Sequence, residues 1–255
     1  MTKVIEVQNL CLTYHSKQGE TLALDDISFN VEHGEFISIV GPSGCGKTTI
    51  LSILAGLLAP SSGKVLVNGE IPKTKDSKCG YMFQRDNLLP WRTIEKNVLL
   101  GLEIQHKNTP ENKARALALL DKYGLGEFKR KRPDELSGGM RQRVALIRTL
   151  ALNPSILLLD EPFSALDYQT RLNVCDDVAN IIRLEKKTAI LVTHDLQEAI
   201  SMSDRIFVLT KRPANIKAVH KVNFDKSLTP FEKRQTLDAE KLFNTLWEEI
   251  QDEQK

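Results

Sequence analysis

Apolar residues follow the spacings of β-strands and of α-helices in different parts of the chain. In the first part, apolar and polar residues alternate over 4–14 and 24–31, which predicts two strands that pair in an antiparallel sheet. The largely apolar run 35–40 predicts a buried strand, and the apolar-faced segment 48–58 predicts a helix that ends before Pro60. A glycine-rich turn separates these two elements, so the chain enters the helix almost directly from the strand.

The rest of the chain has the order of elements that is typical of an α/β protein. Between residues 86 and 135 the strand alternation is absent and segment 112–123 has helical spacing, which predicts a mostly helical insertion. A helix over 168–184 separates two apolar strand candidates, and strands joined in this way pair in parallel. A last helix, rich in acidic residues, is expected over 231–254. The remaining short strands are expected over 63–67, 79–83, 156–159 and 189–193.

Composition and charge exclude several classes of protein. The 255 residues, 41% hydrophobic and 27% charged, suffice for a globular core, which excludes disordered, collagen-like and small disulfide-stapled chains. The 35 Lys and Arg against 33 Asp and Glu leave a net charge of +2, so we expect no nucleic-acid partner. The scattered cysteines form no C-x-x-C pair, which favours a reducing compartment. No signal-peptide pattern and no run of 18 apolar residues occurs, so other chains would have to supply any membrane-spanning part.

The turn after the predicted strand 35–40 carries a phosphate-binding pattern. Residues 41–48 read GPSGCGKT and match G-x-x-x-x-G-K-[S/T] between a strand and a helix. Glycines let backbone N–H groups approach phosphate oxygens, and the helix start adds its positive dipole. In such a loop Lys47 reaches the β- and γ-phosphates and the Thr48 hydroxyl ligates Mg²⁺. The alternative, an ordinary glycine turn, would match by chance in about one per cent of chains of this length. The predicted nucleotide contacts here are Gly41, Pro42, Ser43, Gly44, Cys45, Gly46, Lys47, Thr48 and Thr49.

A second acidic motif follows the predicted strand 156–159. Asp160 and Glu161 come directly after four apolar residues, at the strand edge where ligands of open α/β sheets collect. A carboxylate at the position of Asp160 holds Mg²⁺ in this class of site, and the adjacent Glu161 then faces an attacking water. The alternative is a strand that ends in two solvated acids. The phosphate-binding pattern elsewhere in the chain favours the catalytic interpretation.

A third motif identifies the family that the chain resembles. In LSGGMRQRV (136–144), Ser137 is a suitable N-cap, and Gly138 and Gly139 leave N–H groups uncovered at the helix start. Taken alone, this pattern indicates only a capped helix. LSGGM followed by QRV, however, resembles the signature motif of ABC-type ATPases, and its distance from ILLLDEP (156–162) is similar to that family's.

Further motifs follow in the order of the ABC family, over about residues 4–220. Gln84 resembles the Q-loop glutamine, residues 164–167 the D-loop, His194 the switch histidine, and Tyr14 the aromatic residue that stacks on adenine. The resemblance therefore implies that Lys47, Glu161 and His194 are catalytic. It also implies nucleotide contacts by Tyr14, Gln84 and the three signature residues. The implied Mg²⁺ ligands are Thr48, Gln84 and Asp160.

The resemblance also implies an architecture. We expect an α/β P-loop NTPase of the ABC type with a mixed sheet core, an antiparallel β subdomain and an inserted helical subdomain. The ATP-binding domain would span 4–236, with its core over 4–84 and 154–225 and the helical subdomain over about 85–153. The segment 237–255 would form a C-terminal helical tail.

Segments 80–103 and 209–216 resemble the nitrate/sulfonate/taurine branch of bacterial importers. The expected function is therefore ATP hydrolysis, with ATP and Mg²⁺, that drives uptake of a small solute through a separate permease. The resemblance implies a homodimer at the cytoplasmic face of the membrane, served indirectly by a solute-binding protein. The alternatives are soluble ABC ATPases of DNA repair or translation and a P-loop kinase. The 52 residues between Gln84 and Ser137, the single motif set and the LSGGM sequence argue against them. Trp91 is either a core residue or a contact for a membrane partner.

Overall fold

A six-stranded mixed sheet forms the centre of the molecule. The computed structural model describes residues 2–17, 19–73, 78–225 and 227–253. The strand order is β5-β6-β7-β3-β8-β9, in which the first five strands are parallel and β9 is antiparallel to β8. Every residue of β3, β6 and β7 is buried, which explains their unbroken apolar sequences. The strands are β5 (Cys79–Met82), β6 (Ile156–Asp160), β7 (Thr188–Val192), β3 (Phe36–Val40), β8 (Arg205–Leu209) and β9 (Ile216–Lys221).

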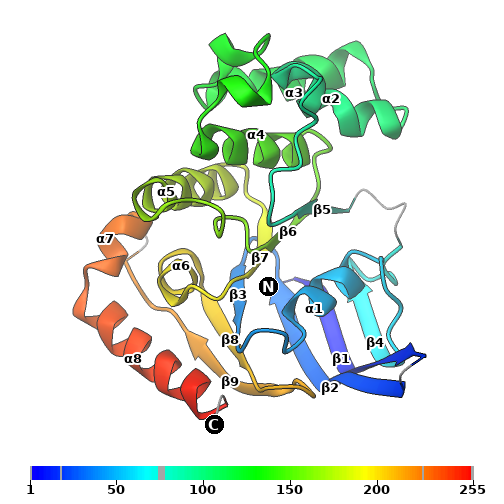
Figure 1. Ribbon diagram of the computed structural model, residues 1–255, viewed down its shortest axis with the longest axis vertical. Coiled ribbons are helices and arrows are strands. Elements are labelled where there is room, and N and C mark those ends of the chain that lie inside the picture. Colours follow the sequence, from blue (N-terminus) through cyan, green and yellow to red (C-terminus); the bar gives the residue numbers. More distant parts are fainter. Residues whose placement is uncertain (1, 18, 74–77, 226, 254–255) are drawn as a thin grey trace.

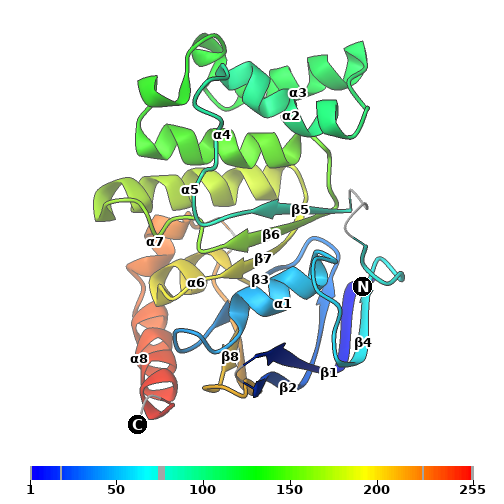
Figure 2. The ribbon, with the colours of Figure 1, turned by 45° about the vertical axis from the view of Figure 1, so that its right-hand side comes forward.

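A smaller antiparallel sheet packs against the central sheet through one helix. Its order is β2 (Gly19–Glu32), β1 (Lys3–Ser16), β4 (Ser62–Val67), and it confirms the predicted antiparallel pair. Helix α1 (Lys47–Leu54) lies between the two sheets (Figure 2), and its buried apolar residues share one core with both. This position holds the start of α1 at the carboxyl edge of the parallel strands.

The predicted helical insertion is a separate lobe beside β5. It contains α2 (Ile94–Ile104), α3 (Pro110–Lys122) and α4 (Gly138–Leu150), with 3₁₀ turns at Gly126–Phe128 and Pro133–Glu135. The three helices enclose their own apolar core, and Figure 1 shows the lobe standing above the edge strand β5. Thr93, Thr109 and Ser137 cap them, each accepting a bond from a backbone N–H of the first turn.

Four more helices cover the central sheet. Helix α5 (Tyr168–Leu184) packs on one face with residues of β6 and β7, and α6 (Leu196–Met202) and α8 (Leu237–Asp252) share a core with β3 and β8. The short α7 (Pro230–Arg234) contacts both α5 and α6. Within the part of the chain that the structure describes, no helix is both long enough and apolar enough to cross a bilayer.

The structure corrects three predicted boundaries or omissions. Helix α1 ends at Leu54 rather than at residue 58, because Gly56 takes a left-handed conformation with φ of +71°. The predicted C-terminal helix is two helices, because Thr236 leaves the helical conformation to cap α8. Strands β8 and β9 and helix α6 were not predicted, since their short segments carry weak periodicity.

Candidate functional site for nucleotide binding and hydrolysis

Two glycines of the loop between β3 and α1 have backbone conformations that other residues rarely adopt. Gly44 and Gly46 have φ of +73° and +126°. A Cβ added to Gly46 would also lie 2.7 Å from Leu24 Cδ2, inside the core under the smaller sheet. The local geometry therefore favours glycine at position 44 and leaves no room for a side chain at position 46.

The Lys47 side chain folds back over this loop. Its Nζ donates to the carbonyl oxygens of Gly41 at 2.8 Å and Pro42 at 2.9 Å, and the residue is only 6% exposed. Within the part of the chain that the structure describes, the start of α1 has no side-chain cap, and its first turn contains no acidic residue. An uncapped helix start beside a lysine suits an anion, so the loop fits the phosphates of a nucleotide.

Thr48 and Asp160, the two predicted Mg²⁺ ligands closest to the loop, touch each other. Thr48 Oγ1 donates to Asp160 Oδ1 at 2.9 Å, and Tyr81 OH donates to Asp160 Oδ2 at 2.9 Å. One carboxylate and one hydroxyl are hard oxygen donors of the kind that hold Mg²⁺ together with substrate phosphates. The residues present therefore fit Mg²⁺ with a nucleotide.

Tyr81 was missing from the predicted site. Burial, followed by the negative charge of Asp160, raises the pKa of its phenol, so Tyr81 remains a donor at physiological pH. In the sequence, only the position of Tyr81 on the strand before Gln84 points to a role in this site. The pairing of β5 with β6 brings it to Asp160, since Tyr81 and Leu158 are register partners.

Glu161 and His194 also lie together, beyond the carboxyl ends of β6 and β7. His194 Nδ1 is 3.1 Å from Glu161 Oε2, and the backbone N–H of Glu161 donates to Val192 O at 2.8 Å. Glu161 has φ of +44°, a strained conformation for a residue other than glycine. The Glu161 carboxylate therefore lies beside His194, at the sheet edge where Asp160 contacts Thr48.

Arg171 joins the segments that follow β6 and β7, and the sequence reasoning missed it. Its guanidinium donates to Asp195 Oδ2 at 3.1 Å and to Leu166 O at 3.0 Å. Asp195 in turn caps α6, and Asp167 caps α5. Arg171 therefore couples the position of the predicted D-loop to the segment that carries His194.

Tyr14 and Arg212 reach the phosphate loop from two other elements. The Tyr14 hydroxyl is 3.0 Å from Thr49 Oγ1, and its side chain is partly exposed, as a platform for a base requires. Arg212 Nη2 donates to Gly44 O at 2.7 Å from the loop between β8 and β9. Arg212 belongs to the segment 209–216 that resembles one importer branch, but its contact with the phosphate loop was not predicted.

We expect Arg212→Ala to raise the KM for ATP about three- to tenfold with little change in kcat. One charge-assisted hydrogen bond to the loop would be lost, while the residues around Asp160 and Glu161 would stay in place. Steady-state ATPase assays measure both constants. Lys211→Ala is the matched control, because its side chain carries the same charge next in the chain and makes no hydrogen bond within the described residues. A fall in kcat with unchanged KM would contradict this positioning role.

The signature residues lie in the helical lobe, on a different part of the chain from the phosphate loop. Ser137 is exposed and caps α4, and Gly139 packs so closely on α5 that a Cβ would lie 2.7 Å from Val174 Cγ2. Among the described residues, no hydrogen bond or ion pair joins Ser137, Gly138 or Gly139 to residues 41–48, and both views show α4 and α1 in separate layers (Figures 1 and 2). One chain therefore does not bring these two predicted phosphate-binding groups together.

Gln84 is exposed at the junction between β5 and the helical lobe, and its side chain makes no hydrogen bond within the described residues. The residues just after it are fastened to α4. Arg141 Nε donates to Asp86 Oδ2 at 3.1 Å, and Arg148 donates to the carbonyl oxygens of Asn87 at 2.7 Å and Asp86 at 2.6 Å. We call residues 84–87 the linker. Because of these bonds, a movement of the linker is transmitted to α4, the helix that begins at the signature residues.

Comparison with known proteins agrees with this geometry. The family described as ABC transporter matches residues 24–164. An uncharacterised ABC transporter ATP-binding protein, YtlC of Bacillus subtilis, is 51% identical over 96% of this chain and 95% of its own. The taurine import ATP-binding protein TauB of Roseobacter denitrificans is 38% identical over 96% and 94%. The dimeric cassette MJ0796, solved after hydrolysis with ADP and Pi, has a TM-score of 0.71 at 32% identity, covering 87% of this chain and 100% of that one.

The fold class inferred from the sequence is confirmed by these matches and by the two sheets and inserted helical lobe described above. The family match covers more than half of the chain, including the phosphate loop and the strand that ends at Asp160. The chain thus belongs to the ABC transporter family, as one of its ATP-binding proteins, which are ATPases coupled to transport.

Proposed function

We propose that this chain is the ATP-hydrolysing subunit of a bacterial importer for a small solute of the nitrate, sulfonate or taurine kind. The observation that carries the proposal is the meeting of Thr48, Asp160, Glu161 and His194 at one sheet edge, beside a phosphate loop. The similarity to a taurine import protein and the resemblance of segments 80–103 and 209–216 support the import direction and the solute class. ATP hydrolysis by this chain, on the cytoplasmic side of the membrane, would drive a separate permease. A solute-binding protein would take part only indirectly.

The roles of the site residues follow from their positions. Lys47 and the backbone of residues 41–49 would hold the phosphates, and Tyr14 would stack on the base. Thr48 and Asp160 would hold Mg²⁺, which neutralises phosphate charge when bound, with Gln84 reaching the same region from the lobe. Glu161 would accept a proton from the attacking water, and His194 would orient that carboxylate and the γ-phosphate.

The separation of the signature residues from the phosphate loop supports a composite site built by two chains. Ser137 and the N–H groups of Gly138 and Gly139 would contact the nucleotide held on Lys47 of a second copy. Two identical chains related by a two-fold axis then form two equivalent sites. The dimeric cassette MJ0796 is consistent with such an arrangement.

The helical lobe offers a contact for the permease near the linker. Trp91 is 70% exposed, which rules out its alternative role as a core residue. It lies between Gln84 and α2, and residues 86–87 are fastened to α4 through Arg141 and Arg148. A partner seated on this surface would therefore respond to the nucleotide through Gln84.

To test the importer function, we expect Trp91→Ala to lower solute uptake about tenfold or more while ATPase activity of the isolated subunit changes less than about twofold. Trp91 would contribute contact area to the permease but nothing to the nucleotide site, and tryptophan is enriched among the interface residues whose truncation costs about 2 kcal/mol or more. Uptake into proteoliposomes with the co-purified permease and ATPase assays of the free subunit give the two numbers. Trp247→Ala is the control, an exposed tryptophan on α8. Failure to co-purify with any permease would refute the importer function.

A further inference from the structure

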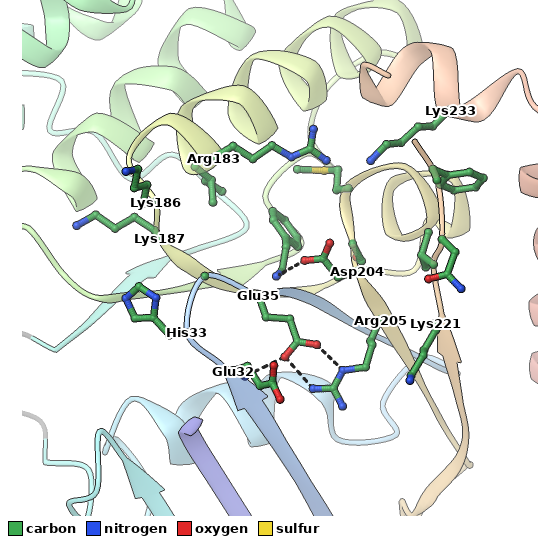
Figure 3. A pocket seen from close by; sticks show the side chains of 18 of the residues that line it. Glu32, His33, Glu35, Arg183, Lys186, Lys187, Asp204, Arg205, Lys221 and Lys233 are labelled. Carbon is green, nitrogen blue, oxygen red and sulfur yellow. Dashed lines mark hydrogen bonds and ion pairs between the residues drawn. The ribbon is translucent and has the colours of Figure 1, made fainter. Parts of the chain in front are cut away.

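A large cavity lies at the edge of the central sheet opposite the nucleotide site. Its volume is about 1040 Å³, and it lies beside the amino ends of β7, β3 and β8, whereas the phosphate loop follows the carboxyl end of β3. The walls come from the turn before β3, the end of α5, the segment before β8, the segment after β9, and α7 (Figure 3). Cavities of this size hold small-molecule ligands in other proteins.

Basic side chains outnumber acidic ones around the cavity. The six Lys and Arg residues exceed the four Asp and Glu residues by two. Arg205 is already paired with Glu35, and Asp204 accepts a hydrogen bond from the Phe36 N–H at 2.8 Å. Among the six basic residues, only Arg205 forms an ion pair within the described residues, and Arg183 and Lys233 are among the five that form none. The basic lining residues are Arg183, Lys186, Lys187, Arg205, Lys221 and Lys233.

Lys233 is the unusual member of this set. The residue is 5% exposed, yet its ammonium has no hydrogen-bond or ion-pair partner among the described residues, and the Phe224 ring lies 6.0 Å away. Figure 3 shows its ammonium directed toward the Arg183 guanidinium, which reaches in from α5. The ammonium of this largely buried lysine has no paired acid, and the facing Arg183 charge repels it, so its position is unfavourable in the protein alone.

The charged groups around Lys233 determine its protonation and leave its surroundings electropositive. Burial and, to a smaller extent, the Arg183 charge lower the pKa of Lys233 to about 8, and the Asp204 charge opposes both. Lys233 therefore remains largely protonated at pH 7. The other titratable groups around the cavity are Glu32, His33 and Glu35 before β3, Lys186 and Lys187 after α5, Arg205 on β8, Lys221 on β9 and Asp225 after it.

We propose that this cavity binds a small metabolite that bears a phosphate group, with its doubly charged oxyanion held between Lys233 and Arg183. A dianion there would supply the missing counter-charge to both side chains and accept charge-assisted hydrogen bonds from each. The rest of the cavity would hold the remainder of the metabolite, between α7 and the turn before β3. The site is independent of the nucleotide site and of the importer function.

Thermal unfolding in the presence of inorganic phosphate tests the proposal. The protein would be saturated with ADP and Mg²⁺ at pH 7, and phosphate would be compared with sodium chloride at equal ionic strength. We expect a saturable rise in Tm with phosphate, because a ligand of the native state stabilises it. The apparent Kd should weaken at least about tenfold in Lys233→Met and in Arg183→Met, since each loses one charged hydrogen bond. Phosphate that bound at the nucleotide site beside ADP would have the same Kd in all variants. Differences in Kd between the variants therefore report binding in this cavity alone.

Two further measurements make the test decisive. Without phosphate, Lys233→Met should unfold at the same or a higher temperature than the wild type, because a buried charge without a partner has been removed. If Lys233→Met does not fold, Arg183→Met decides, because Arg183 is exposed. Lys241→Met, an exposed lysine on α8 outside the cavity, should keep the wild-type Kd. No phosphate effect beyond that of sodium chloride, or equal Kd values in wild type, Lys233→Met and Arg183→Met, would overturn the proposal.

Discussion

Replacing Glu161 with Gln is expected to lower ATP turnover at least about 100-fold, the lower range of a general-base contribution. Glutamine keeps the size of the side chain and its ability to contact His194 Nδ1, but it loses the negative charge and most of the basicity. Glutamine tolerates φ of +44° no worse than glutamate does, so the backbone strain at this position would be unchanged. The loss would therefore come from chemistry rather than from folding.

Nucleotide affinity separates this role from a structural one. ATP binding should stay within about twofold of wild type, because within the described residues Glu161 forms no hydrogen bond with the phosphate loop, and Asp160 keeps its bonds to Thr48 and Tyr81. Single-turnover hydrolysis and equilibrium titration with a fluorescent ATP analogue give the two values. Glu240→Gln, an exposed glutamate on α8, should behave as wild type in both. Normal hydrolysis by Glu161→Gln would assign the general base elsewhere.

Mixing two inactive variants is expected to restore ATPase activity if the sites are shared between chains. Lys47→Ala should bind ATP about ten- to a hundredfold more weakly, because charged hydrogen bonds to the phosphates are lost. Ser137→Arg should bind ATP normally through its own loop, but it places a bulky charge where the γ-phosphate of the opposite nucleotide would lie. Each variant alone has two damaged sites per dimer and should be inactive.

A mixed dimer contains one undamaged site, made by the loop of the Ser137→Arg chain and the signature residues of the Lys47→Ala chain. Random pairing at equal amounts makes half of the dimers mixed, so activity should return to about a quarter of wild type if one site turns over alone. The control is a chain with both substitutions mixed with an equal amount of wild type. That mixed dimer carries one lesion in each of its two sites, so only the wild-type dimers, about a quarter of the total, should hydrolyse ATP. ATPase activity that stays at the level of the separate variants would refute the shared site.

The local motifs of this site were readable from the sequence because each depends on neighbours in the chain. The run of apolar residues before Gly41 and the apolar face after Lys47 place a glycine loop between a strand and a helix, whatever the rest of the fold does. The same holds for Asp160 and Glu161 after β6, and for Ser137 at the start of α4. Boundaries were less certain, as at Gly56, where one left-handed residue ended a helix whose apolar pattern continued.

Contacts between distant segments were decided only by the tertiary structure. The sheet order places β5 beside β6, and this register alone brings Tyr81 to Asp160 across 79 residues of chain. Packing of the β8–β9 loop on the smaller sheet brings Arg212 to Gly44, because the backbone of Ala214 bonds to Ala23 and Asp25. Lys233 belongs to no sequence motif. Only the tertiary structure shows that its ammonium has no paired acid, because α5 and α7 bring Arg183 and Lys233 to the same cavity. Hydrogen bonds and charge compensation depend on distances that strand pairing and helix packing set, and periodicity along a single segment contains no information about them.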